Sequence, residues 1–163
     1  MFASSAASDG SFATEKGFAR MTNFTEFSVS KNPKEHSSKY IDEDFERSEI
    51  VGYATSASYK FDYEPDNEVH QTLAKVADNE LTGDEAKVTI AVVDFSTTSS
   101  SAGVDLPEGV YPCRAREFSV VPSSEGDDSD IYTYSGTLKA VGAATEGYMQ
   151  ITEDGRGTFI TVL

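Results

Sequence analysis

The stretch that decides the fold runs from residue 51 to residue 64 and reads VGYATSASYKFDYE. Apolar or aromatic side chains alternate with small or polar ones along its whole length. One face carries Val51, Tyr53, Thr55, Ala57, Tyr59, Phe61 and Tyr63, and the other carries Gly52, Ala54, Ser56, Ser58, Lys60, Asp62 and Glu64. Because successive side chains of a strand point to opposite sides, this period of two predicts one long β-strand with a mostly apolar face and a small, polar face.

Other segments show the same alternation or an apolar run bounded by turn residues. Phe27 and Val29 alternate with Glu26 and two serines. Further strands are predicted for residues 86–95, 110–121, 131–144, 148–152 and 158–163. The last two are joined by Glu153-Asp154-Gly155-Arg156-Gly157, in which Asp-Gly favours the positive φ angles of a hairpin turn.

One segment has a helical period instead. Residues 66–81 begin with Asp66 or Asn67 as the cap and place Val69, Leu73, Val76 and Leu81 on one side, before Thr82-Gly83 ends the helix. An amphipathic helix of this length covers one face of a sheet. The predicted class is therefore mainly β, an antiparallel β-sandwich or barrel with one flanking α-helix.

Three stretches and the N-terminus lack either period. Residues 1–20 are small and polar and are predicted to be a flexible arm, which leaves residues 21–163 as a single domain. The stretches are residues 31–49, 96–103 and 122–130. The first is unusually long for a loop and holds Tyr40, Ile41 and Phe45, which a solvated linker does not need. We expect it to be a contact arm.

Composition restricts the function. The 163 residues include 28 Asp or Glu and 13 Lys or Arg, so the formal charge is −15. Such a chain is poorly suited to gripping phosphate backbones, since that affinity comes from Lys and Arg. A single cysteine, Cys113, excludes an internal disulfide, no apolar run approaches a membrane helix, and no targeting signal is visible at the start. We expect folding in a reducing cytosol.

No arrangement of residues predicts a reaction. His36 and His70 lack recognisable catalytic partners, and Cys113 lies in a predicted strand, where a small buried side chain is the expected role. Asp127, Asp128 and Asp130 do not have the spacing of an EF-hand loop. We therefore expect neither enzymatic activity nor a metal or other cofactor.

Several segments, in order along the chain, resemble the major tail tube proteins of long-tailed (siphovirus-like) bacteriophages. The similarity covers residues 20–163. It lies in Lys39-Tyr40-Ile41-Asp42-Glu43, Val51-Gly52-Tyr53-Ala54, Tyr59-Lys60-Phe61-Asp62-Tyr63, the helix ending Asn79-Glu80-Leu81-Thr82-Gly83, the strand 86–94 and the terminal hairpin 148–163.

The resemblance implies a β-sandwich that assembles six to a ring, with rings stacked into a tube through which double-stranded DNA passes without specific binding. It implies a virion protein assembled in the host cytoplasm, with tape measure, terminator and distal tail proteins as further partners and no membrane. It also implies that the loop 31–49 reaches the neighbouring ring. The candidate contact residues are Tyr40, Ile41, Asp42, Glu43, Asp44, Phe45, Glu46 and Arg47.

A wall with negative potential would let a polyanion slide, so part of the acidic surplus is expected on the lumen. The lumen-facing candidates lie on the polar side of the early strands and are Glu26, Ser56, Ser58, Lys60 and Asp62, with Lys60 of the opposite sign.

Two other functions remain open. One is a virion protein of another kind, such as a tail terminator or capsid decoration protein. The other is a calcium-dependent adhesive or carbohydrate-binding β-sandwich, which would need residues 125–130 to bind metal.

Overall fold

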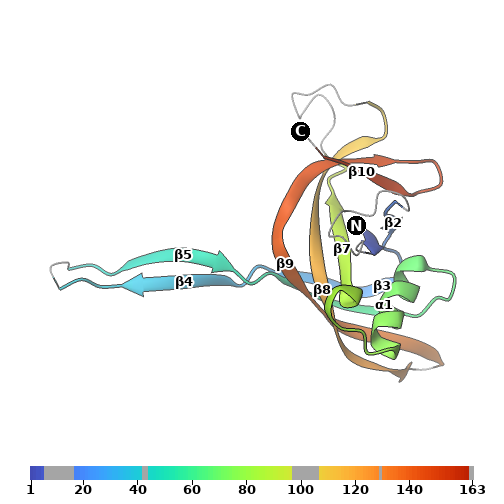
Figure 1. Cartoon of the computed structure of the whole chain (residues 1–163), viewed down its shortest axis with the longest axis horizontal. Coiled ribbons are helices and arrows are strands. Elements are labelled where there is room, and N and C mark those ends of the chain that lie inside the picture. Colours follow the sequence, from blue (N-terminus) through green and yellow to red (C-terminus); the bar gives the residue numbers. More distant parts are fainter. Residues whose placement is uncertain (6–16, 42–43, 97–106, 129, 162–163) are drawn as a thin grey trace.

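The structure is a computed structural model that describes residues 1–5, 17–41, 44–96, 107–128 and 130–161. It is mainly β and antiparallel with one α-helix, as predicted (Figure 1). The elements in chain order are β1 (Phe2–Ser5), β2 (Ala19–Arg20), β3 (Phe24–Ser30), β4 (Pro33–Ser38), β5 (Arg47–Tyr53), β6 (Ser56–Asp62), α1 (Glu68–Asp78), the 3-10 helix η1 (Gly83–Ala86), β7 (Lys87–Val93), β8 (Val110–Asp128), β9 (Ile131–Ile151) and β10 (Gly157–Thr161).

Strands β8 and β9 organise the sheet because they are far longer than the others, with 19 and 21 residues. The sheet order is β2-β1-β7-β8-β9-β6-β3, and β10 also pairs with β9. The β8–β9 register is interrupted between Ala115 and Glu117, and Gly142 opposite takes a φ of 76°. Such a bulge bends a strand pair, and Figure 1 shows β9 curving strongly. Each of the two long strands therefore runs through both of two differently oriented halves of one sandwich-like sheet.

The half that contains β3 and β6 is covered by the helix. Ala57, Tyr59 and Phe61 of β6 are buried together with Val69, Leu73 and Val76 of α1, Leu138 of β9 and Val120 of β8. The predicted alternation of β6 is confirmed, because Ser56, Ser58, Lys60 and Asp62 lie on the opposite side. Here the apolar stripe of the helix and the apolar face of the sheet form one core.

The other half closes on itself. Phe18, just before β2, and Gly157, which begins β10, exchange two backbone hydrogen bonds, with N–O distances of 2.6 and 2.8 Å. The strands β10-β9-β8-β7-β1-β2 thus form a ring around a second core, which contains Phe18, Ala91, Val93, Cys113, Ala115, Met149 and Phe159. The expected buried role of Cys113 is confirmed.

The helix is shorter than predicted and has three turns. It spans Glu68–Asp78 instead of 66–81, and Asn67 is its N-cap: the Asn67 side-chain oxygen accepts from the backbone N–H groups of Val69 and His70. It ends before Gly83 because Glu80 adopts a left-handed φ of 49°, and Leu81 N–H donates to the Val76 carbonyl at 3.1 Å. This is the C-terminal motif that glycine usually supplies.

The predictions of one strand through residues 51–63 and of a loop over 31–49 are both wrong. The strand is interrupted at Ala54 and Thr55, between β5 and β6, and β5 instead pairs with β4 in a separate hairpin. Figure 1 shows this hairpin projecting far from the body. Val51 and Tyr53 are therefore exposed instead of sharing the core with Tyr59 and Phe61.

Other boundaries also differ. Strand β8 continues to Asp128, so residues 122–128 are not a loop, and the predicted strands 131–144 and 148–152 are one strand, β9. Residues 1–20 are not wholly a flexible arm, because β1 pairs with β7 and β2 with β1. Most of the predicted Ser/Thr-rich loop 96–103 lies outside the described residues, while the predicted turn at 153–157 is confirmed.

Candidate interaction surfaces

The β4–β5 hairpin, described for residues 33–41 and 44–53, is joined to the body at a defined pivot. Asn32 adopts a φ of 45°, which lets the chain turn out of β3. Its carbonyl accepts from Ala54 N–H at 3.0 Å, and its side-chain amide donates to the Ala54 carbonyl at 3.0 Å and to Ser56 Oγ at 3.2 Å. The ribbon of β3 and β6 thus continues into the hairpin with one sharp change of direction.

Within its described residues, the hairpin has no core of its own. There, its strands pair only with each other, and the residues of β4 and β5 are exposed or, at Ser38 and Gly52, half-buried. A two-stranded hairpin in water is only marginally stable. Its exposed apolar side chains fall into two groups, Tyr40, Ile41 and Phe45 near the turn and Ile50, Val51 and Tyr53 on β5. This apolar surface needs a partner if the hairpin is to keep its shape.

The six described candidate contact residues lie at or next to the hairpin tip, which we define as residues 39–41 and 44–46. Tyr40 and Ile41 follow β4, Asp44, Phe45 and Glu46 precede β5, and Arg47 begins β5. The Phe45 side chain is 82% exposed. Asp42 and Glu43 lie outside the described residues.

The lumen candidates lie together on the face of the sheet opposite α1, which we call the outer face. Glu26 of β3 is directly opposite Lys60 of β6, and Ser58 Oγ donates to Glu26 Oε1 at 2.8 Å. Thr133 Oγ1 of β9 donates to Asp62 Oδ1 at 3.3 Å. Ser56 of β6 is opposite Lys139 of β9. Polar and charged side chains cover this face across β3, β6, β9 and β8.

Charge on the strands of the outer face is balanced where their side chains are described. Three residues are acidic, Glu26, Asp62 and Glu117, and three are basic, Lys60, Lys87 and Lys139. Lys87 Nζ lies 3.9 Å from Glu117 Oε1 and 2.7 Å from Asp84 Oδ1. The acidic surplus lies elsewhere: residues 64–85, in and around α1, include seven Asp or Glu and one Lys.

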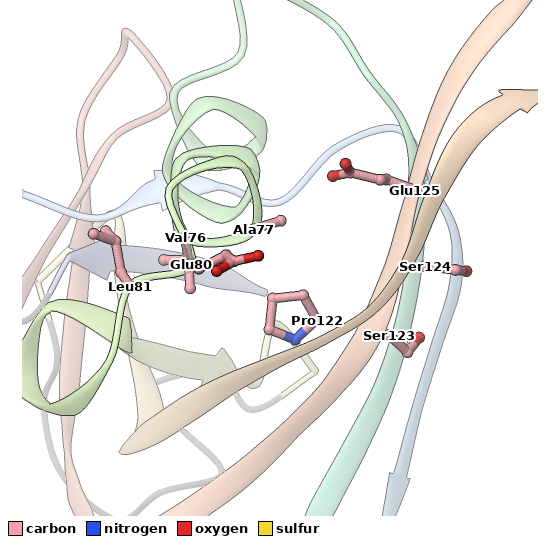
Figure 2. Close-up of a pocket in the computed structure, with 8 residues that line it drawn as sticks. All are labelled: Val76, Ala77, Glu80, Leu81, Pro122, Ser123, Ser124 and Glu125. Atoms are coloured by element: carbon pink, nitrogen blue, oxygen red, sulfur yellow. The ribbon is translucent and has the colours of Figure 1, made fainter.

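A groove of about 380 Å³ separates the C-terminal end of α1 from β8, and we call it the helix groove. Its lining residues are Val76, Ala77, Glu80, Leu81, Pro122, Ser123, Ser124 and Glu125. Figure 2 shows the Glu80 and Glu125 carboxylates directed toward the space between helix and strand, with Pro122 below them in this view. The groove therefore combines an apolar floor with two carboxylates, which suits an apolar side chain next to a cation.

The surroundings of His70 give this side chain a structural role. Its ring is fully buried and stacks on Phe61, with ring centroids 4.4 Å apart. Nε2 lies 3.0 Å from the Thr22 carbonyl oxygen, and Nδ1 accepts from Glu64 N–H at 3.2 Å, which fits the neutral Nε2–H form. Burial lowers the pKa of His70, against weaker opposing effects of the Thr22 hydrogen bond and of the Glu64 and Asp62 carboxylates.

Cys113 and the acidic side chains are the other residues considered for catalysis or metal binding. Burial raises the pKa of the Cys113 thiol to about 11, so the thiol is protonated at neutral pH and a poor nucleophile. Among the described residues, no three His, Cys, Asp or Glu side chains gather as a metal site requires. In the same part of the chain, no helix is long and apolar enough to cross a membrane.

No protein-family model matches the chain, and no curated protein sequence matches it. The function of the chain is therefore inferred from these surfaces. The sequence indicated the exposed apolar residues of the tip and the polar side of β6. It did not indicate the helix groove, because Pro122–Glu125 was expected to be a loop and not a strand beside α1.

Proposed function

We propose that this chain is a structural subunit that assembles with copies of itself, and that the assembly is a bacteriophage tail tube of stacked six-membered rings. In this proposal the protein has no enzymatic activity and belongs to the virion. Its partners are other copies of the chain, the tape measure, terminator and distal tail proteins, and the DNA that passes through the bore. Support comes from the resemblance in segment order and from three structural features.

The observation that carries the proposal is the projecting hairpin. Six exposed apolar residues on an element without a core are costly in a monomer and are typical of a surface that is buried on association. Tyrosine and phenylalanine at the tip are residue types enriched in protein interfaces. The hairpin reaches well beyond the body, so what it contacts is another molecule (Figure 1).

The second feature is an open sheet edge. Strand β3 is the last strand of the sheet on its side, and within the described residues its outer edge pairs with no other strand. Exposed edges bind further strands unless they are blocked. Five of the seven β3 side chains are exposed, and neither proline nor lysine blocks the edge. A neighbouring copy that pairs here with the right rotation would extend the sheet around a ring.

The third feature is the outer face. Its Ser, Thr and paired charges offer no excess of lysine or arginine to hold phosphates. We assign this face, with Glu26, Ser56, Ser58, Lys60 and Asp62, to the wall of the bore. Because its charge is balanced, the wall would let DNA pass because it does not hold the phosphates, and not because it repels them.

Electron microscopy of the purified full chain, over a range of protein concentrations, tests the proposal. We expect rings with a central hole and hollow rods of stacked rings. Single rings that never stack would favour a terminator. Compact particles of one subunit at every concentration would overturn the proposal.

A further inference from the structure

We propose that β3 of one copy pairs with the open edge of β8 in the next copy, and that this pairing brings Val29 and Lys31 to the helix groove. The inference rests on the proposed self-assembly and adds to it the surface that receives β3. The occupant of the groove is therefore a second copy of this chain.

The edge of β8 that faces away from β9 is only partly paired. Strand β7 covers this edge along residues 113–119. Along residues 120–128, no strand in the described part of the chain pairs with it. The helix groove follows the same segment, because residues 122–125 form its β8 wall (Figure 2). A strand added here would therefore gain backbone hydrogen bonds and lie beside the groove at the same time.

The directions of the strands fit a ring. The helix-covered half of the sheet has the order β8-β9-β6-β3, and each strand is antiparallel to the next. Strands β8 and β3 therefore run in opposite directions and, within the described residues, leave one open edge on each side. Rotation about a ring axis keeps the direction of a strand along that axis. Strand β3 of one copy thus meets β8 of the next as an antiparallel pair.

The side chains at the two edges match on the helix side of the sheet. Val29 pairs with the core residue Ala57 and so faces the same side as α1, yet the Val29 side chain is 44% exposed. On β8, Glu125 pairs with the core residue Tyr134 and faces that side too. The apolar part of the groove consists of Val76, Ala77, Leu81 and Pro122. Val29 of an incoming β3 is therefore placed to pack on this part.

The charges match as well. Residues 27–34, which lead from β3 into the hairpin, contain two lysines and no acidic residue. The two segments that form the groove, residues 76–85 and 120–128, contain seven Asp or Glu and no Lys or Arg. Lys31 follows Val29 by two positions, so the alternation of a strand puts both on one side. A Val29 seated in the groove thus brings the Lys31 ammonium to the groove carboxylates.

The contact is directional and small. Two copies joined this way leave one β3 edge and one β8 edge free, so the contact propagates until a ring closes. Strand β3 has only seven residues, and a single strand pairing is smaller than a typical stable interface. The contact therefore holds copies together in combination with the contact made by the hairpin and does not replace it.

Charge exchange at Lys31 and Glu80 tests the contact. Both residues are exposed, so neither change should alter the unfolding temperature. We expect Lys31→Glu and Glu80→Lys each to raise the protein concentration needed for assembly at least about threefold, because an attraction becomes a repulsion. The Lys31→Glu/Glu80→Lys double variant should return to within about twofold of the wild type.

Glu108→Lys is the matched control, because Glu108 is exposed, lies before β8 and is not part of the groove. It makes the same charge change as Glu80→Lys. Its combination with Lys31→Glu should assemble no better than Lys31→Glu alone. Equal recovery in both double variants would show that only the total charge matters, and would overturn the contact.

A disulfide tests the geometry independently. Val29→Cys with Pro122→Cys in one chain should give covalent multimers when assembled material is oxidised, in a ladder that ends at the ring size. Val29→Cys with Val121→Cys should give none, because Val121 points away from the side on which its neighbour Val120 joins the core. If the wild type forms rings but rescue and ladder are both absent, β3 pairs elsewhere and only this inference fails. If the wild type never assembles, the proposed function fails and takes the inference with it.

Discussion

At the scale of single residues, Gly136 is where the sheet leaves no room for a side chain. It lies on β9 directly opposite Tyr59 of β6, whose ring crosses over it. A Cβ at this position would lie 2.6 Å from the Tyr59 hydroxyl oxygen and 2.6 Å from the Val121 carbonyl oxygen. The backbone carbonyl cannot move without disturbing the β8–β9 ladder.

We therefore expect Gly136→Ala to lower the free energy of unfolding by about 1–3 kcal/mol, the usual cost of overpacking. Urea denaturation monitored by circular dichroism measures it. Gly126→Ala is the matched control, because a Cβ at Gly126 on neighbouring β8 has no atom within 4 Å. Equal stability of the two variants would show that Tyr59 does not occupy this place.

His70 makes the fold sensitive to acid. The neutral ring bridges the Thr22 carbonyl and Glu64 N–H, and burial holds its folded pKa below that of the unfolded chain. The unfolded state therefore binds the proton first. The contribution of His70 to stability is complete above about pH 6.5, the pKa of an unperturbed histidine, and decreases as the pH falls toward the lowered folded pKa.

We expect the free energy of unfolding of the wild type to fall between pH 7.5 and pH 5.5. His70→Phe keeps an aromatic ring on Phe61 and removes the titrating group, so it should be less stable at pH 7.5 but flatter over this range. His36→Asn, which alters the exposed histidine of β4, should keep the slope of the wild type. A slope unchanged in His70→Phe would assign the acid sensitivity to the carboxylates.

At the scale of elements, the helix shows what sequence could and could not specify. The apolar stripe Val69, Leu73 and Val76 predicted the helix and the face that it buries, and both are confirmed. Sequence left Asp66 and Asn67 as equal candidates for the cap. The structure uses Asn67, whose side-chain amide also donates to Thr22 Oγ1, 45 positions away, at 3.1 Å, a contact that local sequence does not reveal. The early end at Glu80 was not predicted because a left-handed glutamate carries no sequence signal.

The cap makes a direct prediction. Asn67→Ala should cost about 1 kcal/mol of stability, since two backbone N–H groups lose their acceptor, and Asp66→Ala should cost less than about 0.5 kcal/mol. Thermal unfolding of both variants beside the wild type measures the difference. A larger loss in Asp66→Ala than in Asn67→Ala would place the cap one residue earlier.

The strands were predictable where one side is buried and not where both sides are exposed. Alternation gave β6 and the faces of its residues correctly, because the period of two reflects burial on one side. In β4, the side chains of Lys34, Glu35 and His36 are all exposed, so no such pattern forms. The break at Ala54 was equally hidden, since the turn comes from the φ of Asn32 on the facing segment.

At the scale of the whole molecule, two separate cores and one projecting hairpin share the chain. The long strands β8 and β9 carry both cores, and no local pattern reveals that they bend at Gly142. The helix groove is likewise a product of tertiary structure, because it forms only where β8 continues past Pro122 beside α1. What sequence did indicate is the imbalance between a strongly acidic chain and an apolar tip, which is the basis for proposing self-association.

Sedimentation velocity tests that central claim most directly, with the wild type compared with a Tyr40→Ser/Ile41→Asn/Phe45→Ser variant over a range of concentrations near 0.15 M salt, where the screening length is about 8 Å. Because these side chains are exposed at the tip, the variant should unfold at the same temperature as the wild type. The account predicts large, concentration-dependent species for the wild type and a monomer for the variant. A monomeric wild type at every concentration, or a variant that assembles equally well, would contradict it.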